Sequence, residues 1–285
     1  MTPDEYCTHK VGSAGSSFYY SFLFLSRAKR RAITALYAFC REIDDIVDEC
    51  SDAQVAHTKL AWWREEIDRT FRGQPNHPVS RALNPAIEHY GLPRAQFLEI
   101  IDGMQMDIEQ TRYASFAELK VYCHRVASVV GLLSAAIFGY RNERTAAFAR
   151  NLGLAFQLTN IIRDVGEDAR RNRIYLPLED LLHFGVEPTE ILTGQGGANF
   201  HALMEFEAQR AGRFYEEAMQ NLVVDDRADQ IPSLIMAAIY RATLDEIGAA
   251  NYPVLRARVS LTPLRKFWIA WKTQRRELRL AKGAA

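Results

Sequence analysis

Two stretches of the 285-residue chain concentrate carboxylates at helical spacing. The first, YAFCREIDDIVDE, places Asp44 and Asp48 four residues apart, and the second, QLTNIIRDVGEDARRNRIYLP, does the same with Asp164 and Asp168. In a helix, side chains four residues apart lie on one face, where two like charges repel by roughly 0.2–0.5 kcal/mol. Each aspartate pair therefore predicts a bound ion or a charged side chain that offsets this repulsion.

Each pair extends a narrow polar stripe along its helix. At about 100° per residue, each stripe falls within about 80° of arc. The stripes contain Tyr37, Arg41, Asp44 and Asp48 on the first helix, and Gln157, Asn160, Asp164 and Asp168 on the second. A lone acidic pair usually marks a solvated face. Two stripes of the same make-up, each with an arginine within one turn, instead favour stripes that point inward.

Carboxylates that point inward need a metal ion or a paired charge, because isolated charges are costly to bury. Mg²⁺ takes oxygen ligands and is typically held by a few carboxylates together with substrate phosphates; Mn²⁺ also suits such ligands. We therefore expect Asp pairs on opposing helices to bind Mg²⁺ and a diphosphate. Arginines suited to bidentate phosphate binding are Arg41, Arg163, Arg170, Arg171 and Arg173.

The chemistry that follows is ionisation of an allylic diphosphate, in which metal ions and arginines stabilise the leaving group. The resulting carbocation must be kept from water in an apolar cavity. We expect aromatic lining from Phe18, Tyr19, Phe22, Tyr37 and Phe156.

The helices that position these stripes follow from the spacing of apolar residues. It predicts helices over 29–49, 52–72, 94–110, 115–139, 144–168, 199–222, 231–250 and 262–280. Gly91 with Pro93, and Gly139 before Asn142, predict helix ends, and the glycine-rich segment 183–200 predicts a flexible loop. Alternation of β-branched residues is scarce, so we expect one all-α domain over residues 1–285.

The overall composition argues against several other classes of protein. The 35 Lys and Arg balance the 35 Asp and Glu, so overall charge does not favour a nucleic-acid partner. The four cysteines lack CxxC spacing, which indicates neither a zinc site nor a disulfide framework and favours a reducing, cytoplasmic setting. No run of about 18 apolar residues is present, so we expect no membrane-spanning helix, and we expect no signal peptide.

Both aspartate-rich stretches resemble those of the squalene/phytoene synthase family, which joins two prenyl diphosphates head to head. The segment YCHRVASVVG, residues 122–131, resembles the central YCxxVAGxVG helix of that family, and the likeness runs from about Ser16 to Tyr252. The resemblance implies an isoprenoid-synthase-type helical bundle with a central cavity. It also implies a Mg²⁺-dependent prenyltransferase that acts on two molecules of farnesyl diphosphate or a longer homologue.

The resemblance implies roles for individual residues. Metal binding is implied for Asp44, Asp48, Asn160, Asp164 and Asp168. A catalytic role is implied for Tyr37, Arg41 and Tyr122. Substrate binding is implied for Ser17, Phe18, Arg41, Gln157, Arg163, Arg173 and Tyr175. The chain departs from some carotenoid-type members, which carry His and Lys where Ala14 and Ser16 stand here.

Within the family, the stretch from Gly15 to Glu49 looks most like bacterial enzymes that stop at presqualene diphosphate. Such enzymes couple two farnesyl diphosphates 1′-2-3 and pass the product to downstream squalene- and hopanoid-forming enzymes. We therefore expect a presqualene diphosphate synthase that does not use NADPH. The alternative is a phytoene or dehydrosqualene synthase of carotenoid biosynthesis.

Two further classes remain open. A terpene cyclase also uses aspartate pairs, on a single prenyl diphosphate. A non-catalytic isoprenoid-binding helical protein is the alternative of a different class, and the presence of all four aspartates disfavours it. A carboxylate di-iron bundle would need Glu-x-x-His pairs, which are absent from the sequence.

The last predicted helix carries a mixed pattern of basic and apolar side chains. Its basic residues are Lys266, Lys272, Arg275, Arg276 and Arg279, and they alternate with Phe267, Trp268, Trp271 and Leu278. This pattern is typical of an interfacial amphipathic helix and predicts peripheral membrane contact. A terminal helix docked on the bundle by its aromatic side chains is the alternative, and it is slightly favoured.

Overall fold

Helices make up nearly all of the regular structure in the computed structural model, which describes residues 1–13, 18–50 and 52–283. Eight predicted helices are present as α3 (Arg27–Glu49), α4 (Ala53–Phe71), α6 (Arg94–Glu109), the run from α7 (Phe116–Cys123) through η1 (His124–Ser128) to α8 (Val129–Phe138), α9 (Glu143–Arg170), α12 (Ala198–Asn221), α14 (Ile231–Ala249) and α15 (Pro263–Gly283). The described residues contain no strand, and one isolated bridge pairs Arg112 with Ile174. The all-α prediction is confirmed.

Several shorter helices lie where none was predicted: α1 (Pro3–Ser13), α2 (Phe18–Phe22), α5 (Pro78–Tyr90), α10 (Leu178–Phe184), α11 (Pro188–Leu192) and α13 (Val224–Arg227). Pro78 and Pro188 begin α5 and α11, because the first turn of a helix does not need the N–H that proline lacks. The predicted flexible loop over 183–200 is therefore wrong in part. It contains α11, where Glu190 accepts a hydrogen bond from the backbone N–H of Glu187 at 2.9 Å.

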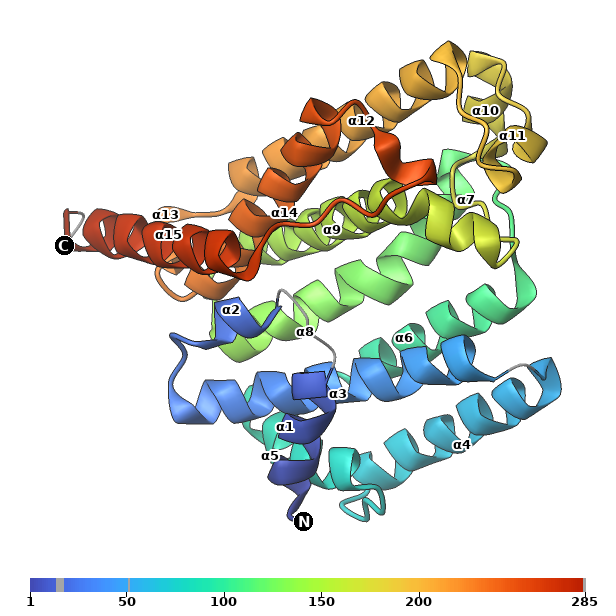
Figure 1. Cartoon of the computed structure of the whole chain (residues 1–285). Helices are drawn as coiled ribbons and strands as arrows, with labels where there is room; N and C mark the ends of the chain where they lie inside the picture. The colour runs from blue at the N-terminus through green and yellow to red at the C-terminus, as the bar shows by residue number, and fades with distance from the viewer. Residues whose placement is uncertain (14–17, 51, 284–285) are drawn as a thin grey trace.

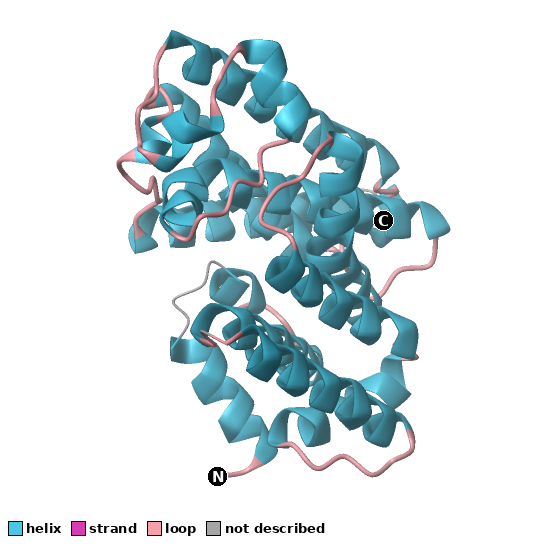
Figure 2. Ribbon diagram, turned by 90° about the vertical axis from the view of Figure 1, so that its right-hand side faces the viewer, coloured by secondary structure: helices cyan, strands magenta, loops and turns pink. Residues whose placement is uncertain are grey.

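The helices form two groups with the run from α7 to α8 between them (Figures 1 and 2). In the lower half of Figure 1, α1 and α3 to α6 pack around a core that includes Phe39, Leu60 and Phe97. In the upper half, α9 packs along α12 around a second core that includes Phe148 and Leu203. The run from α7 to α8 contributes buried side chains to both cores.

The sequence of α3 explains how the first aspartate-rich stretch is positioned. Ser26 caps the helix by accepting a hydrogen bond from the backbone N–H of Lys29. Beyond this cap, Leu36, Phe39 and Ile43 recur at helical spacing and are completely buried in the lower core. Burial of this apolar face fixes the rotation of α3 and turns its polar stripe towards the space between the two groups of helices.

The run from α7 to α8 approaches α9 unusually closely. A π-helical turn, η1, interrupts the run, and such turns often lie at functional sites. A Cβ atom at Gly153 of α9 would lie 2.6 Å from the carbonyl oxygen of Ala127, and one at Gly131 of α8 would lie 2.6 Å from that of Ala149. The two helices therefore meet backbone to backbone.

The same segment, Phe116–Phe138, is long and apolar enough by composition to span a membrane. Such a helix was not predicted, because polar residues interrupt its apolar ones. It packs against α3, α6 and α9 and contributes buried side chains to both cores.

The close approach of the helices predicts that Gly153→Ala destabilises the fold. The added methyl group would press on backbone atoms that cannot rotate away, so we expect the free energy of unfolding to fall by about 1–3 kcal/mol. Gly12→Ala in α1 is the matched control, because a Cβ there meets nothing within 4 Å. Urea denaturation of both variants measures the difference. Equal stability of the two variants would contradict the packing described here.

Candidate active site

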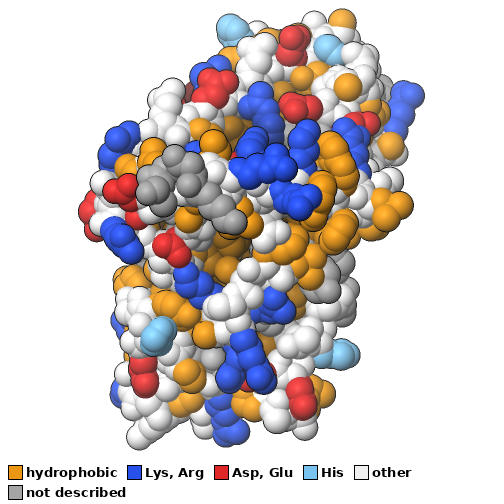
Figure 3. Space-filling model, turned by 90° about the vertical axis from the view of Figure 1, so that its left-hand side faces the viewer, with side chains coloured by type: hydrophobic (Ala, Val, Ile, Leu, Met, Phe, Trp, Pro, Cys, Tyr) orange, Lys and Arg blue, Asp and Glu red, His pale blue; other side chains and the backbone are white. Residues whose placement is uncertain are grey.

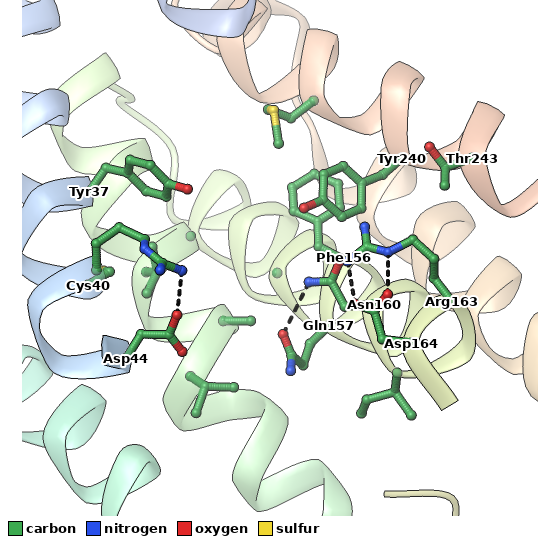
Figure 4. A pocket seen from close by; sticks show the side chains of 18 of the residues that line it. Tyr37, Cys40, Asp44, Phe156, Gln157, Asn160, Arg163, Asp164, Tyr240 and Thr243 are labelled. Atoms are coloured by element: carbon green, nitrogen blue, oxygen red, sulfur yellow. Dashed lines mark hydrogen bonds and ion pairs between the residues drawn. The ribbon is translucent and has the colours of Figure 1, made fainter. Parts of the chain in front are cut away.

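A cavity of about 860 Å³ lies between the two groups of helices, which is towards the upper end of the range of ~300–1,000 Å³ for ligand sites. Its lining on α3 includes the whole predicted stripe: Tyr37, Arg41, Asp44 and Asp48. The facing wall, on α9, carries the second stripe: Gln157, Asn160, Asp164 and Asp168. Figure 4 shows Asp44 and Asp164 on these opposite walls. The two stripes thus line one cavity.

The remaining predicted site residues divide into two sets. Tyr122, Arg163, Arg173 and Tyr175 line the cavity, as do the aromatic side chains of Phe22 and Phe156. Ser17 and the side chains of Phe18 and Tyr19 lie outside the described residues.

Arginines neutralise the aspartates on the α3 wall. Arg41 Nη1 donates to Asp44 Oδ2 at 2.6 Å, and Arg171 Nη1 donates to Asp48 Oδ1 at 2.6 Å. Because Arg171 is the C-cap of α9, the second ion pair joins the two walls of the cavity. Burial raises the pKa of Asp44 to about 6, against the lowering influence of Arg41. The Asp44 side chain is still 41% exposed, so water in the cavity moderates this rise.

The α9 wall is neutralised in the same way. Asp164 accepts hydrogen bonds from Arg163 Nε at 2.8 Å and from Arg258 Nε at 2.9 Å. One turn further along α9, burial and then the negative charge of Asp164 raise the pKa of Asp168 to about 7. These contacts give Asp44, Asp48 and Asp164 arginine partners, and they place guanidinium groups beside any anion in the cavity.

The side chain of Asn160 indicates that the α9 wall binds a ligand. Its Oδ1 atom is buried and has no hydrogen-bond partner in the described part of the chain, while Nδ2 makes a long contact of 3.5 Å to Gln157 Oε1. A buried acceptor without a partner is energetically costly. Asn160, Asp164 and Asp168 present oxygen atoms along one face, which is the donor chemistry that Mg²⁺ prefers.

The described residues contain no group of three or more His, Cys, Asp or Glu side chains close enough to hold a metal ion unaided. An ion bound by either wall would therefore complete its shell with water and with oxygen atoms of a bound phosphate, as Mg²⁺ commonly does. The residues present fit Mg²⁺ on these terms.

A buried carboxylate that the sequence analysis missed lies on α6. Asp107 Oδ2 accepts a hydrogen bond from Tyr122 Oη at 2.9 Å, and Oδ1 accepts one from Tyr175 Oη at 2.7 Å. The two tyrosine rings stack with their centroids 5.3 Å apart. Burial raises the pKa of Asp107 to about 6, although both hydroxyl groups favour its charged form. The carboxylate thus fixes the direction of both hydroxyl groups at the cavity wall.

Tyr175 reaches this carboxylate because the chain turns back sharply after α9. Asn172 has a φ of 56°, in the left-handed region that asparagine tolerates better than most residues. The N–H of Ile174 then donates to the carbonyl oxygen of Thr111 at 3.0 Å, which holds the returning segment against the residues that follow α6. Arg173 and Tyr175 are both carried to the cavity by this turn.

Further cavity residues that were not predicted include Tyr240 of α14, Arg258, and Lys266 of α15. Arg258 lies in the irregular segment between η2 (Pro253–Leu255) and α15, whose path no periodic pattern indicates. Among the described lining residues, seven basic side chains stand against six acidic ones. This near balance leaves little spare positive charge for several phosphate groups, so a polyanionic substrate would need cations bound with it.

Comparison with known proteins agrees with this geometry. The sequence profile of the squalene/phytoene synthase family matches residues 11–265. The 15-cis-phytoene synthase of Synechocystis sp. is 36% identical over 94% of this chain and 84% of its own length. The 15-cis-phytoene synthase of Synechococcus elongatus is 35% identical over 92% of this chain and 89% of its own.

Two solved structures have closely related folds. A dehydrosqualene synthase in complex with a ligand superimposes with a TM-score of 0.87 and 30% identity, covering 97% of each chain. The squalene synthase HpnC of Alicyclobacillus acidocaldarius superimposes with a TM-score of 0.77 and 28% identity, covering 88% of this chain and 94% of its own.

The buried Asp107 predicts a pH dependence of stability. Its pKa is raised from 3.8 to about 6 in the folded chain, so the folded state binds this proton more tightly than the unfolded state does. The stabilisation is complete below about pH 4 and is lost as the pH rises through about 6. Relative to Asp107→Asn, we expect the free energy of unfolding of the unchanged protein to fall by about 1 kcal/mol between pH 5 and pH 8.

Urea unfolding of both proteins at the two pH values measures this difference. If the two proteins differed in stability by the same amount at both values, Asp107 would not be the titrating group.

Proposed function

This chain belongs to the squalene/phytoene synthase family and is a prenyltransferase, and from this premise we propose that it is of the phytoene synthase type. Its substrate would be two molecules of geranylgeranyl diphosphate and its product a hydrocarbon of 40 carbons. The observation that carries this proposal is the 35–36% identity to two 15-cis-phytoene synthases over more than nine-tenths of the chain. The expected presqualene diphosphate synthase is supported less well than this alternative.

The proposed reaction has two stages. In the first, the C1–O bond of one substrate breaks and its diphosphate leaves. The C2=C3 double bond of the second substrate attacks the resulting cation, and loss of a proton closes a cyclopropane ring. In the second, the remaining diphosphate leaves, the cyclopropylcarbinyl cation rearranges to join the two former C1 atoms, and a second proton is lost to form a double bond. No reductant is needed, in line with the expectation that NADPH is not used.

The chain itself supplies groups for the departing diphosphates. Arg41 and Arg171 on one side, and Arg163 and Arg258 on the other, bring planar donors to the cavity that suit two phosphate oxygens at once. Mg²⁺ held by the aspartates of the two walls and by Asn160 would add positive charge against the leaving oxygen. Diphosphates would therefore bind between the stripes, at the polar end of the cavity.

The remaining lining suits the prenyl chains and the cation. Apolar side chains such as Met104, Val130 and Leu152 line the rest of the cavity and exclude water that would capture the cation. Tyr122 and Tyr175 donate their hydroxyl hydrogens to Asp107, so the oxygen lone pairs are free to face positive charge in the cavity. These oxygens are candidates to stabilise the cation or to accept the departing proton.

A product of 30 carbons from farnesyl diphosphate is the second candidate. The high structural similarity to a dehydrosqualene synthase favours it, and the likeness to a squalene synthase adds support for presqualene diphosphate as an intermediate or product. The link to hopanoid synthesis and to downstream squalene-forming enzymes stays a prediction from the sequence.

Incubation with each prenyl diphosphate and Mg²⁺, without NADPH, tests the proposal by mass spectrometry of intact and dephosphorylated products. We expect a C40 hydrocarbon from geranylgeranyl diphosphate, formed faster than any product from farnesyl diphosphate, and no change when NADPH is added. A C30 diphosphate with a cyclopropyl carbinol skeleton as the main product would instead establish a presqualene diphosphate synthase. A C30 hydrocarbon would establish a dehydrosqualene synthase.

The proposed metal sites predict that Asp48→Ala and Asp164→Ala each lower kcat by about 10²–10³-fold, because the leaving diphosphate loses stabilisation. Both variants should also need more Mg²⁺ to reach half-maximal rate. Glu49→Ala is the control, since Glu49 is exposed, adjoins Asp48 and does not line the cavity. Near-normal turnover of either aspartate variant at saturating Mg²⁺ would rule out metal binding by both walls.

A further inference from the structure

The C-terminal helix α15 turns its large apolar side chains away from the protein. It packs against α14 and α2 through a face that includes Ala270, Thr273 and Glu277, of which Glu277 is only 1% exposed. Trp268 and Trp271 are 54% and 42% exposed. The predicted docking of this helix on the bundle is confirmed, but its aromatic side chains do not make the contact. Ala270, Thr273 and Glu277 do so, together with the partly buried Ile269.

An ion pair explains why a carboxylate occupies the buried face. Glu277 Oε2 accepts a hydrogen bond from Arg227 Nε of α13, and Arg276 also donates to Glu277 from α15 itself. This pair fixes the rotation of α15 about its axis. The rotation leaves Leu264, Phe267 and Leu278 exposed along with the two tryptophans.

Most of the exposed surface of α15 consists of two neighbouring stripes, which together we name the outer face; Leu280, 53% exposed, lies outside them. At about 100° per residue, each stripe spans about 100° of arc. The apolar stripe contains Leu264, Phe267, Trp268, Trp271 and Leu278, and the basic stripe contains Arg265, Lys272, Arg275, Arg276 and Arg279. Glu277 is the only acidic residue of α15, and it is buried. Arg265 pairs with Glu246 of α14 and Arg276 with Glu277, so Lys272, Arg275 and Arg279 supply most of the positive charge of the outer face.

Cation–π contacts hold the two stripes together. Lys272 Nζ lies 4.7 Å from the centroid of the Trp268 ring, and Arg275 Cζ lies 4.8 Å from that of Trp271. Figure 3 views the molecule from the side where α15 ends and shows lysine and arginine side chains gathered with hydrophobic ones beside them. Positive charge and apolar surface are thus presented together.

We propose that the outer face of α15 docks the protein on a bilayer that contains anionic lipids. Tryptophan rings favour the boundary between headgroups and acyl chains, and a neighbouring basic stripe complements anionic headgroups. A helix with an apolar stripe beside a basic stripe lies in the plane of the membrane–water interface. The proposal goes beyond the proposed function and does not depend on which hydrocarbon is made.

A second copy of the chain is a poorer occupant of this face. In a two-fold dimer the same patch meets itself, so the two basic stripes would be brought together. Like charges in such contact weaken association. Charge complementarity therefore favours an anionic surface.

The position of α15 gives this docking a consequence for the reaction. Leu261, just before the helix, and Lys266, within its first two turns, line the cavity. A bilayer that contacts the outer face would thus lie beside the element that closes one side of the cavity. If the proposed function holds, the product is a hydrocarbon that does not dissolve in water. A bilayer beside α15 would shorten the path of this product from the cavity to lipid.

Co-sedimentation of the full chain with vesicles tests the proposal. We expect binding to vesicles of equimolar phosphatidylcholine and phosphatidylglycerol that weakens as salt is added, and much weaker binding to phosphatidylcholine alone. Lys272→Gln with Arg279→Gln should lower the partition coefficient about 25-fold, at about fivefold per basic residue. Trp268→Ser with Trp271→Ser should lower it more than tenfold, because apolar burial at the interface scales with the area lost.

Matched variants elsewhere on the surface provide the controls. Trp62 of α4 is 41% exposed, so Trp62→Ser removes a comparable aromatic side chain. Arg81→Gln with Arg213→Gln removes two exposed charges from α5 and α12. These controls should bind vesicles as the unchanged protein does. None of the substituted residues lines the cavity, so every variant should turn over detergent-dispersed substrate at the normal rate.

Three outcomes would overturn the proposal. The first is no sedimentation with either vesicle, and the second is equal sedimentation with both. The third is a concentration-dependent dimer that the tryptophan variant dissociates, which would assign the outer face to a second copy. Vesicle binding is measured without substrate, so it distinguishes failure of this proposal from failure of the proposed function.

Discussion

Carboxylates on two facing helices repel each other across one cavity, and the rest of the structure depends on how that repulsion is offset. Each of Asp44, Asp48 and Asp164 has an arginine partner, and the pair between Asp48 and Arg171 joins α3 to the end of α9. The two groups of helices are thus connected by the same charges that would otherwise separate them. A diphosphate and its cations would exchange with these partners, so the ion pairs both hold the walls and prepare the site.

The buried cluster around Asp107 meets a similar constraint in another way. Among the residues that the structure describes, two tyrosine hydroxyl groups rather than an ion pair satisfy this carboxylate. A carboxylate bonded in this manner orients its neighbours, and Arg173 lies beside it, with Nη2 donating to the carbonyl oxygen of Asp107 at 3.1 Å. Asp107 therefore belongs to the charged part of the cavity, while side chains such as Met104, Val130 and Leu152 form apolar lining. The presence of both kinds of lining matches a substrate with a diphosphate head and a prenyl tail.

Much of this arrangement could be predicted from the sequence. The helices that carry both polar stripes follow from apolar residues at helical spacing, and the stripes themselves from aspartates four residues apart. Asp107 was missed because it stands alone, although a single charged residue in line with Phe97, Ile100 and Met104 on α6 was a usable signal. Arg258 gave no such signal, because the path of an irregular segment depends on tertiary contacts.

The backbone contact between α8 and α9 constrains how such a cavity can change over evolutionary time. Gly131 and Gly153 both line the cavity, and at both positions any side chain would collide with the opposite main chain. That part of the wall cannot be moved inward by a bulkier residue or outward by a smaller one. Substitutions that adapt the cavity to longer or shorter substrates must therefore occur where side chains form its walls, on α3, α6 and α14. The position of the wall at the glycine contact stays unchanged.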